Sequence, residues 1–115
     1  MKWMPIPMHD FAKGEAYREV AVFKDNIDAV ASRVGAAAES YEVEGLGRVR
    51  GFCLRSDHGE YAYLEQAEIA AEPDLISIAI DKRAANWQAH VEAIALAVGA
   101  KGLRWIGFAD LTGGL

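Results

Sequence analysis

Two neighbouring segments with strand-like alternation constrain the fold of this sequence more than any other feature. Residues 48–55 and 60–66 both carry aromatic or β-branched side chains in strand patterns, and residues 56–59 between them read Ser-Asp-His-Gly. A polar run that ends on glycine is typical of a four-residue hairpin loop. We therefore expect the two segments to pair as an antiparallel β-hairpin.

The register of this hairpin decides which side chains share a face. If Arg55 lies opposite Glu60, alternation places four bulky side chains on one face and three other side chains on the opposite face. The bulky face consists of Phe52, Leu54, Tyr61 and Tyr63, and the opposite face of Cys53, Ala62 and Leu64. We favour the bulky set as the core. In the alternative packing, Cys53, Ala62 and Leu64 face the helices, and the two tyrosines are exposed and available for binding.

The remaining chain divides into further strand and helix patterns. Period-two alternation predicts strands over 17–23, 75–80 and 103–108, whereas apolar residues spaced by three and four predict helices over 25–38 and 87–98. With the hairpin included, the order is strand, helix, three strands, helix, strand.

This order, β-α-β-β-β-α-β, predicts the fold class. It implies an α+β domain in which two helices pack on one face of a mostly antiparallel sheet of about five strands. Residues 45–47 contain two glycines and are expected to redirect the strand that begins at Tyr41. We expect one domain over 1–115, with an extended N-terminal arm over 1–15 and a C-terminal tail over 109–115.

Length and composition are those of an ordinary soluble domain. The 115 residues are 52% hydrophobic and 25% charged, which is sufficient for a core without disulfides or metal. The single cysteine, Cys53, favours a reducing compartment because it cannot form an internal disulfide. The longest apolar run, 93–100, is too short to span a membrane, and the N-terminus does not resemble a signal peptide. We therefore expect a cytoplasmic protein with no membrane association.

Residue types that carry catalysis or bind metals are few and dispersed. The three histidines are His9, His58 and His90. They fall in three different predicted elements and lack the spacing of a metal site. Cys53 lies in the middle of a strand, where cysteine usually acts as a small buried hydrophobe. We expect no catalytic residues, no cofactor and no metal, and thus not an enzyme.

Negative charge is concentrated in one part of the sequence. The chain has 17 acidic and 12 basic side chains, for a net charge of -5. Between residues 57 and 81 there are seven acids and no lysine or arginine. The seven are Asp57, Glu60, Glu65, Glu68, Glu72, Asp74 and Asp81. This distribution disfavours nucleic acid as a partner and favours a docking surface for a basic protein. The alternative is that the segment is a solvated acidic loop with no binding role.

The order of elements resembles that of the small immunity proteins of bacterial contact-dependent growth inhibition and related polymorphic toxin systems. The matching pieces are the helix over 25–38, the segment over 47–54, the strand over 75–80, the helix over 87–98 and the closing segment 103–105. The resemblance implies a compact cytoplasmic domain that binds the nuclease end of a toxin.

We therefore expect a non-enzymatic immunity protein that covers the basic substrate groove of a cognate toxin, as a monomer or weak homodimer. Carboxylates would take the place of nucleic-acid phosphates, and tyrosines would supply desolvated anchors. The predicted partner-binding residues are Asp57, Glu60, Tyr61, Tyr63, Glu65, Glu68, Glu72 and Asp74.

Two other function classes also fit the sequence. The first is a small cytosolic enzyme or ligand-binding domain with a pocket between sheet and helices, built from residues such as His58, Cys53 or Tyr61. The second is an assembly subunit that dimerises through a sheet edge. A deep cavity with a titratable group inside favours the first class, and the mass in solution tests the second.

Overall fold

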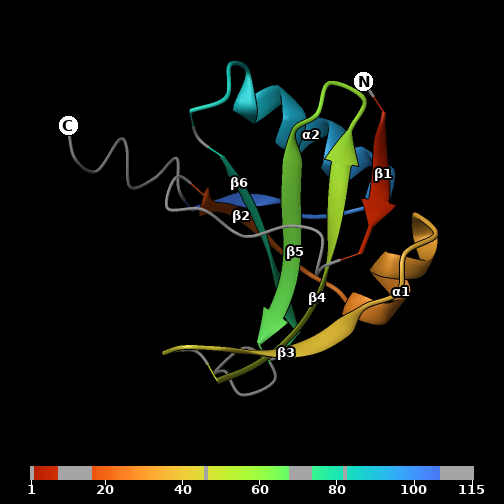
Figure 1. The fold of residues 1–115 in the computed structure, drawn as a ribbon, viewed down its shortest axis with the longest axis vertical. Coiled ribbons are helices and arrows are strands. Elements are labelled where there is room, and N and C mark those ends of the chain that lie inside the picture. The colour runs from red at the N-terminus through yellow and green to blue at the C-terminus, as the bar shows by residue number, and fades with distance from the viewer. Residues whose placement is uncertain (1, 8–16, 46, 68–73, 82, 107–115) are drawn as a thin grey trace.

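The computed structural model describes residues 2–7, 17–45, 47–67, 74–81 and 83–106. Seven strands and two helices lie within these ranges (Figure 1). In chain order they are β1 (Trp3–Ile6), β2 (Tyr17–Lys24), α1 (Ile27–Arg33), β3 (Glu39–Val43), β4 (Gly47–Ser56), β5 (Tyr61–Ala67), β6 (Leu75–Asp81), α2 (Trp87–Val98) and β7 (Arg104–Trp105).

The strands form one sheet in the order β1-β4-β5-β6-β2-β7, and β3 also pairs with β4. Every one of these pairings is antiparallel. The α+β class and the antiparallel sheet are confirmed, whereas the expectation of about five strands is wrong. The two additional strands come from Trp3–Ile6, which was expected in an extended arm, and from the separation of β3 and β4 into a hairpin.

Strand β1 is stable only because it pairs with a distant segment. Its four residues lie opposite residues 53–56 of β4, with Pro5 opposite Leu54. Proline removes a backbone donor and is therefore tolerated in an edge strand. Local sequence does not mark such a short, proline-containing strand, which explains why the arm was predicted instead.

The β4–β5 hairpin is confirmed, but its predicted register is wrong by one residue. Arg55 lies opposite Tyr61 rather than Glu60. The Ser56 N–H donates to the Glu60 carbonyl at 2.8 Å, and the Ser56 hydroxyl accepts from the N–H groups of His58 and Glu60. Five residues, 56–60, therefore separate the paired residues Arg55 and Tyr61 where four were expected between paired residues, and the extra residue changes which side chains share a face.

The two faces of the sheet consequently differ from both predicted packings. The inner face, which the helices cover, carries Phe52, Leu54, Ala62 and Leu64, together with the isoleucines of β6. The outer face carries Cys53, Tyr63 and Ala79, with Tyr17, Tyr61 and Ile6 packed against them. Each face therefore combines residues from both of the sets expected from the sequence.

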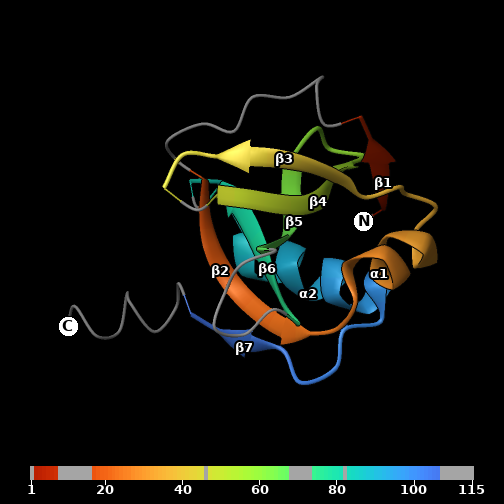
Figure 2. The same ribbon diagram turned by 90° about the horizontal axis from the view of Figure 1, so that it is seen from below.

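Both helices lie on the inner side, and the sheet curves around them (Figure 2). This confirms the expectation of two helices on one face. α2 matches its prediction and ends at Gly99, whose φ of 69° satisfies the left-handed cap position. The described residues form one compact unit with a radius of gyration of 13.1 Å.

α1 is shorter than the predicted helix over 25–38. Asn26 caps its N-terminus by accepting a hydrogen bond from the Ala29 N–H, and the helix ends at Arg33. Gly35 follows with a φ of 73° and turns the chain away from the helix axis. The residues after Gly35 therefore run toward β3 instead of extending the helix.

Ion pairs fix α1 against the rest of the domain. Arg50 of β4 contacts Asp28 at 2.7 Å, and Arg33 contacts Asp25 at 2.8 Å. Arg33 also donates to the Val98 carbonyl at the end of α2. The hydrogen bond from Arg33 lowers the pKa of Asp25, so this carboxylate remains charged well into the acidic range.

The final strand is shorter than expected. β7 comprises Arg104–Trp105, and Gly107 and Phe108 of the predicted segment lie outside the described residues. Neither helix in the described ranges is sufficiently long and apolar to cross a membrane.

Candidate functional site

The predicted partner-binding residues lie at different places in the fold. Asp57 is exposed in the β4–β5 turn, whereas Asp74 is exposed at the opposite end of the sheet, just before β6. Glu68 and Glu72 lie outside the described residues. The structure therefore places the described acids of the 57–81 segment at two ends of the sheet and in its interior.

Glu65 is the interior member of this set. Its side chain lies on the outer face and is only 6% exposed. It accepts a hydrogen bond from the Tyr41 hydroxyl of β3. Burial and this hydrogen bond raise the pKa of Tyr41, which therefore stays protonated and remains a donor. Glu65 thus joins β5 to β3 inside the fold.

Gly51 of β4 makes room for this contact. Gly51 lies opposite Glu65, and a Cβ atom at this position would come within 2.5 Å of the Leu64 carbonyl oxygen and 3.2 Å of Glu65 Cγ. No larger residue fits without displacing backbone. The glycine lets the Glu65 side chain lie across β4 and reach Tyr41.

Glu60 also has an internal partner. Its Oε2 lies 2.8 Å from His90 Nε2, and the His90 side chain is buried while that of Glu60 is partly exposed. The Trp3 ring packs edge-on to the His90 ring at 5.8 Å. This cluster connects β1, the β4–β5 loop and α2, and so its first role is to hold these elements together.

The two predicted tyrosine anchors differ in access. Tyr63 is 3% exposed and packs with Cys53 in the outer-face cluster, where its ring meets that of Tyr17 edge-on. Tyr61 is partly exposed, and the Arg55 guanidinium lies 5.7 Å from its ring centroid. Of the pair, Tyr61 is the one that a partner can reach.

The residues proposed for an enzyme pocket are not assembled between sheet and helices. Cys53 is buried on the outer face, and burial raises the pKa of its thiol to about 12. The thiol is therefore protonated, and not nucleophilic, at neutral pH. His58 is exposed in the β4–β5 turn, with its Nε2 3.8 Å from Asp57.

Within the described ranges, no group of three or more His, Cys, Asp and Glu side chains is placed to hold a metal ion. Asp81, the last acid of the 57–81 segment, contacts Arg83 at 3.0 Å. The hydrogen bond from Arg83 lowers the pKa of Asp81. This carboxylate is therefore already paired within the fold.

One end of the sheet gathers acids from segments that are distant in the sequence. Tyr41, Val49 and Ala67 form one cross-strand row, beyond which lies the tip of the β3–β4 hairpin. Figure 1 shows this tip, the end of β5 and the start of β6 at the same end of the molecule. The exposed acids here are Glu42, Glu44 and Asp74, which we call the acidic end, and the exposed Arg48 lies opposite Glu42. Strands β4 and β5 lie between β3 and β6, so Asp74 is at the same end of the sheet as Glu42 and Glu44 but not beside them.

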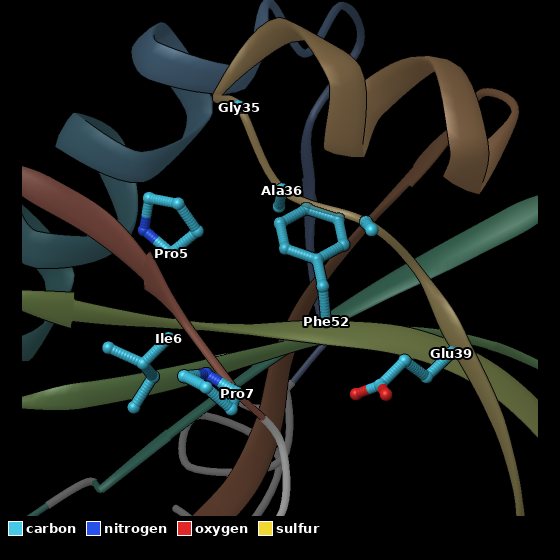
Figure 3. Close-up of a pocket in the computed structure, with 8 residues that line it drawn as sticks. Pro5, Ile6, Pro7, Gly35, Ala36, Glu39 and Phe52 are labelled. Atoms are coloured by element: carbon cyan, nitrogen blue, oxygen red, sulfur yellow. The ribbon is translucent and has the colours of Figure 1, made fainter.

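A cavity of about 340 Å³ lies further along β3 (Figure 3). It arises because β1 and β3 pair with consecutive stretches of the same edge of β4, Ile6 opposite Cys53 and Glu39 opposite Gly51. Phe52 lies between these two pairings and lines the cavity, and the connection after α1 supplies Ala36. We call this space the junction cavity.

The junction cavity could not be predicted from local sequence patterns. Its walls come from residues 5–7, 35–37, 39 and 52, which the fold alone brings together. The one sequence signal is the Pro5-Ile6-Pro7 run, since prolines at a strand end stop the pairing of the backbone. Comparisons with known proteins found no matching family model, no matching curated protein and no matching solved structure.

Proposed function

We propose that this protein is a cytoplasmic binding protein that neutralises a toxin domain with a basic surface, in the manner of the small bacterial immunity proteins. It acts by occupying the partner's substrate groove and not by catalysis. The observation that carries this proposal is the acidic end, where the β3–β4 hairpin and the start of β6 expose the carboxylates of Glu42, Glu44 and Asp74 at the same end of the sheet.

The chemistry of the acidic end suits a partner that binds phosphates. A nuclease groove presents lysine and arginine side chains, and carboxylates can pair with them in place of nucleic acid. Clustered charge of one sign also raises encounter rates and makes them dependent on salt. Glu42 and Glu44 extend the acidic character of the chain beyond the 57–81 segment, so the contact surface we propose includes two carboxylates that the sequence-based expectation did not contain.

The internal contacts divide the predicted residues into two roles. Glu60 and Glu65 support the fold, because one contacts buried His90 and the other accepts from Tyr41. Asp74 is exposed and belongs to the proposed contact surface. Tyr61 lies toward the other end of β5 and forms the outer limit of a partner footprint that would run along the hairpin, whereas Asp57 lies in the turn beyond this limit.

A growth assay with the toxin tests this proposal. We expect a large secreted protein with a nuclease-like end to be encoded beside this chain, and the catalytic domain of that protein is expressed in bacteria with and without the chain. We expect the chain to restore growth, and a Glu42→Gln, Glu44→Gln, Asp74→Asn variant to lose most of that protection because it lacks three carboxylates of the contact surface.

A charge-matched variant supplies the control. Glu19→Gln, Asp57→Asn, Glu92→Gln removes the same charge from exposed positions elsewhere in the described chain. We expect it to protect nearly as well as the unmodified protein. Equal loss of protection in both triple variants would contradict the acidic end as the contact surface, and absence of protection by the unmodified chain would contradict the function itself.

A further inference from the structure

Another cavity, of about 240 Å³, lies where β7 and β2 separate. β7 pairs with β2 through Arg104 and Trp105, and Phe23 and Lys24 extend beyond that pairing. Gly102, with a φ of 68°, turns the connection from α2 before β7 begins. Figure 2 shows this connection beside the end of β2. The space between the two segments is therefore left open.

Strand register defines the floor of this cavity. Val22 lies opposite Arg104, and Lys24 lies opposite Leu75. Phe23, between Val22 and Lys24, belongs to the inner core cluster, so the two pairs project from the outer face. Val22 is buried and Leu75 is half-buried, whereas the lysine and the arginine are exposed. The cavity thus has an apolar floor below two charged side chains.

Lys101 adds a third cation to the rim. Lys24, Lys101 and Arg104 line the cavity, and all three are exposed. Among the described residues, none of these three side chains has a hydrogen-bond or ion-pair partner. Arg33 and Arg50, by contrast, each contact an aspartate. In a chain of net charge -5, three such cations meet at one opening, which we call the basic groove.

The acids around the basic groove do not neutralise it. Asp25 contacts Arg33 at 2.8 Å, and this hydrogen bond is the main cause of its lowered pKa, to which the charge of Lys101 adds a smaller part. Glu19, on the outer face of β2, accepts a hydrogen bond from a serine of β6. Asp74 is exposed next to the start of β6. The three cations outnumber this one carboxylate, so the opening keeps a positive charge.

The charge and the depth of the basic groove favour one class of ligand. A phosphate monoester carries about 1.5 to 2 negative charges at neutral pH. Arginine pairs with phosphate oxygens through two parallel hydrogen bonds, and lysine binds them as a point charge. Because the apolar floor lies below the charged rim, a ligand enters with its organic part first and keeps its phosphoryl group among the cations. A phosphorylated protein side chain would enter in the reverse orientation, which favours a free small molecule.

We infer that the basic groove binds a small phosphate monoester. Lys24, Lys101 and Arg104 surround its phosphoryl group, and its organic part contacts Leu75. The volume of about 240 Å³ is below the ~300 Å³ typical of sites for larger organic ligands, so the organic part is as small as a short hydrocarbon chain. This inference does not depend on the proposed function, because it concerns a free anion and not the basic partner of the acidic end.

An NMR titration of the full chain with n-butyl phosphate tests this inference. We expect saturable shifts of the amide signals of Phe23, Leu75 and Gly102, with a dissociation constant in the millimolar range, on the order expected for so small a ligand. The double variant Lys101→Gln, Arg104→Gln should weaken binding by about tenfold, because it removes two of the three cations around the phosphoryl group.

The double variant Lys2→Gln, Arg48→Gln is the matched control. It removes the same charge from exposed positions in other parts of the described chain, and it should bind n-butyl phosphate like the unmodified protein. Equal weakening in both double variants would overturn the basic groove as the site, since binding would then follow net charge alone. Absence of localised shifts in the unmodified protein would overturn it as well.

Two comparisons between probes test the chemistry of the ligand. n-Butanesulfonate has the same hydrocarbon chain and a single negative charge, so it should bind more weakly, and equal binding would overturn the assignment to a phosphate. Inorganic phosphate lacks the hydrocarbon and should also bind more weakly than n-butyl phosphate. Leu75→Ala, at a half-buried position, should remove this second difference while leaving the binding of inorganic phosphate unchanged. A difference that persists in Leu75→Ala would overturn the apolar floor as the site of the organic part.

Discussion

The two faces of the sheet are built from different chemistry. The inner face packs aliphatic and aromatic side chains against α1 and α2, and its one buried ionisable side chain among the described residues, His90, lies beside Trp3. The outer face buries a thiol, a phenol and a carboxylate, namely those of Cys53, Tyr63 and Glu65, and the Tyr41 hydroxyl donates to the carboxylate. Both faces exclude water, but the inner face does so mainly with apolar side chains, whereas the outer face also buries polar groups that bond to one another.

This difference predicts how each face responds to change. An apolar core loses free energy in proportion to the volume removed, and the loss does not depend on pH. A buried polar network depends on complete pairing and on the protonation states of its members. Substitutions and pH should therefore distinguish the two faces.

The largest effect is expected from truncation on the inner face. Leu64 is fully buried between the strands and the helices, and Leu64→Ala should lower the free energy of unfolding by about 3 kcal/mol. Urea denaturation at neutral pH measures this, and the loss should be the same at alkaline pH. A loss below about 1 kcal/mol would show that this face does not carry the core.

Gly51→Ala should have the next largest effect. The new methyl group would collide with the Leu64 carbonyl and press on Glu65, so we expect a loss of about 2 kcal/mol. Gly45→Ala is a useful control, because Gly45 has open space around its Cβ position and is affected only by its positive φ. If Gly51→Ala were as stable as the unmodified protein, the proposed passage of Glu65 across β4 would be wrong.

Tyr41→Phe should have a smaller effect. It removes the hydroxyl that donates to buried Glu65 while keeping the ring, and we expect a loss of about 1 to 2 kcal/mol. Tyr61→Phe provides a comparison at a partly exposed position of the same face. Equal losses in the two variants would mean that the Tyr41–Glu65 hydrogen bond contributes nothing specific to stability.

The smallest effect concerns the outer face and the pH. Its buried groups should leave the free energy of unfolding unchanged near neutral pH and lower it in alkaline solution. Burial raises the pKa of Cys53 from 9.0 to about 12 and that of Tyr17 from 10.0 to about 12. Above about pH 9 the unfolded chain therefore loses protons that the folded chain retains, and stability falls as pH rises toward 12. Urea denaturation at a series of pH values checks this.

Cys53→Ala sharpens the alkaline prediction. Without the thiol, the decline should begin near the ordinary tyrosine pKa of 10.0 instead of the ordinary cysteine value of 9.0. A stability profile that is flat up to pH 11, or one that Cys53→Ala leaves unchanged, would contradict a buried, protonated outer face.

The parts of the fold that were predicted correctly are those with strong local patterns. The apolar spacing of Trp87, Val91, Ile94 and Val98 identified α2, and the alternation on both sides of a polar loop identified the β4–β5 hairpin. Its register was wrong because hydrogen bonds to the Ser56 side chain, and not loop composition, set the loop length. One residue of difference was sufficient to exchange the faces of a whole strand.

The candidate site could be predicted only in part. Charge counting identified the acids around Asp74, but which of them are exposed depends on contacts that no local pattern encodes, such as Tyr41 with Glu65. The junction cavity depends on the meeting of Pro7 and Glu39, which are far apart in the sequence. Long-range pairing along one edge of β4 creates it, so composition and periodicity gave no indication of it.

The most direct test of the account is the salt dependence of association between this protein and the toxin domain that we propose as its partner. Stopped-flow measurements from about 50 to 500 mM salt should show the association rate of the unmodified protein falling by about tenfold or more. The Glu42→Gln, Glu44→Gln, Asp74→Asn variant should associate more slowly at low salt and show a clearly shallower dependence. The same steep dependence in this variant as in the unmodified protein would contradict recognition through the acidic end.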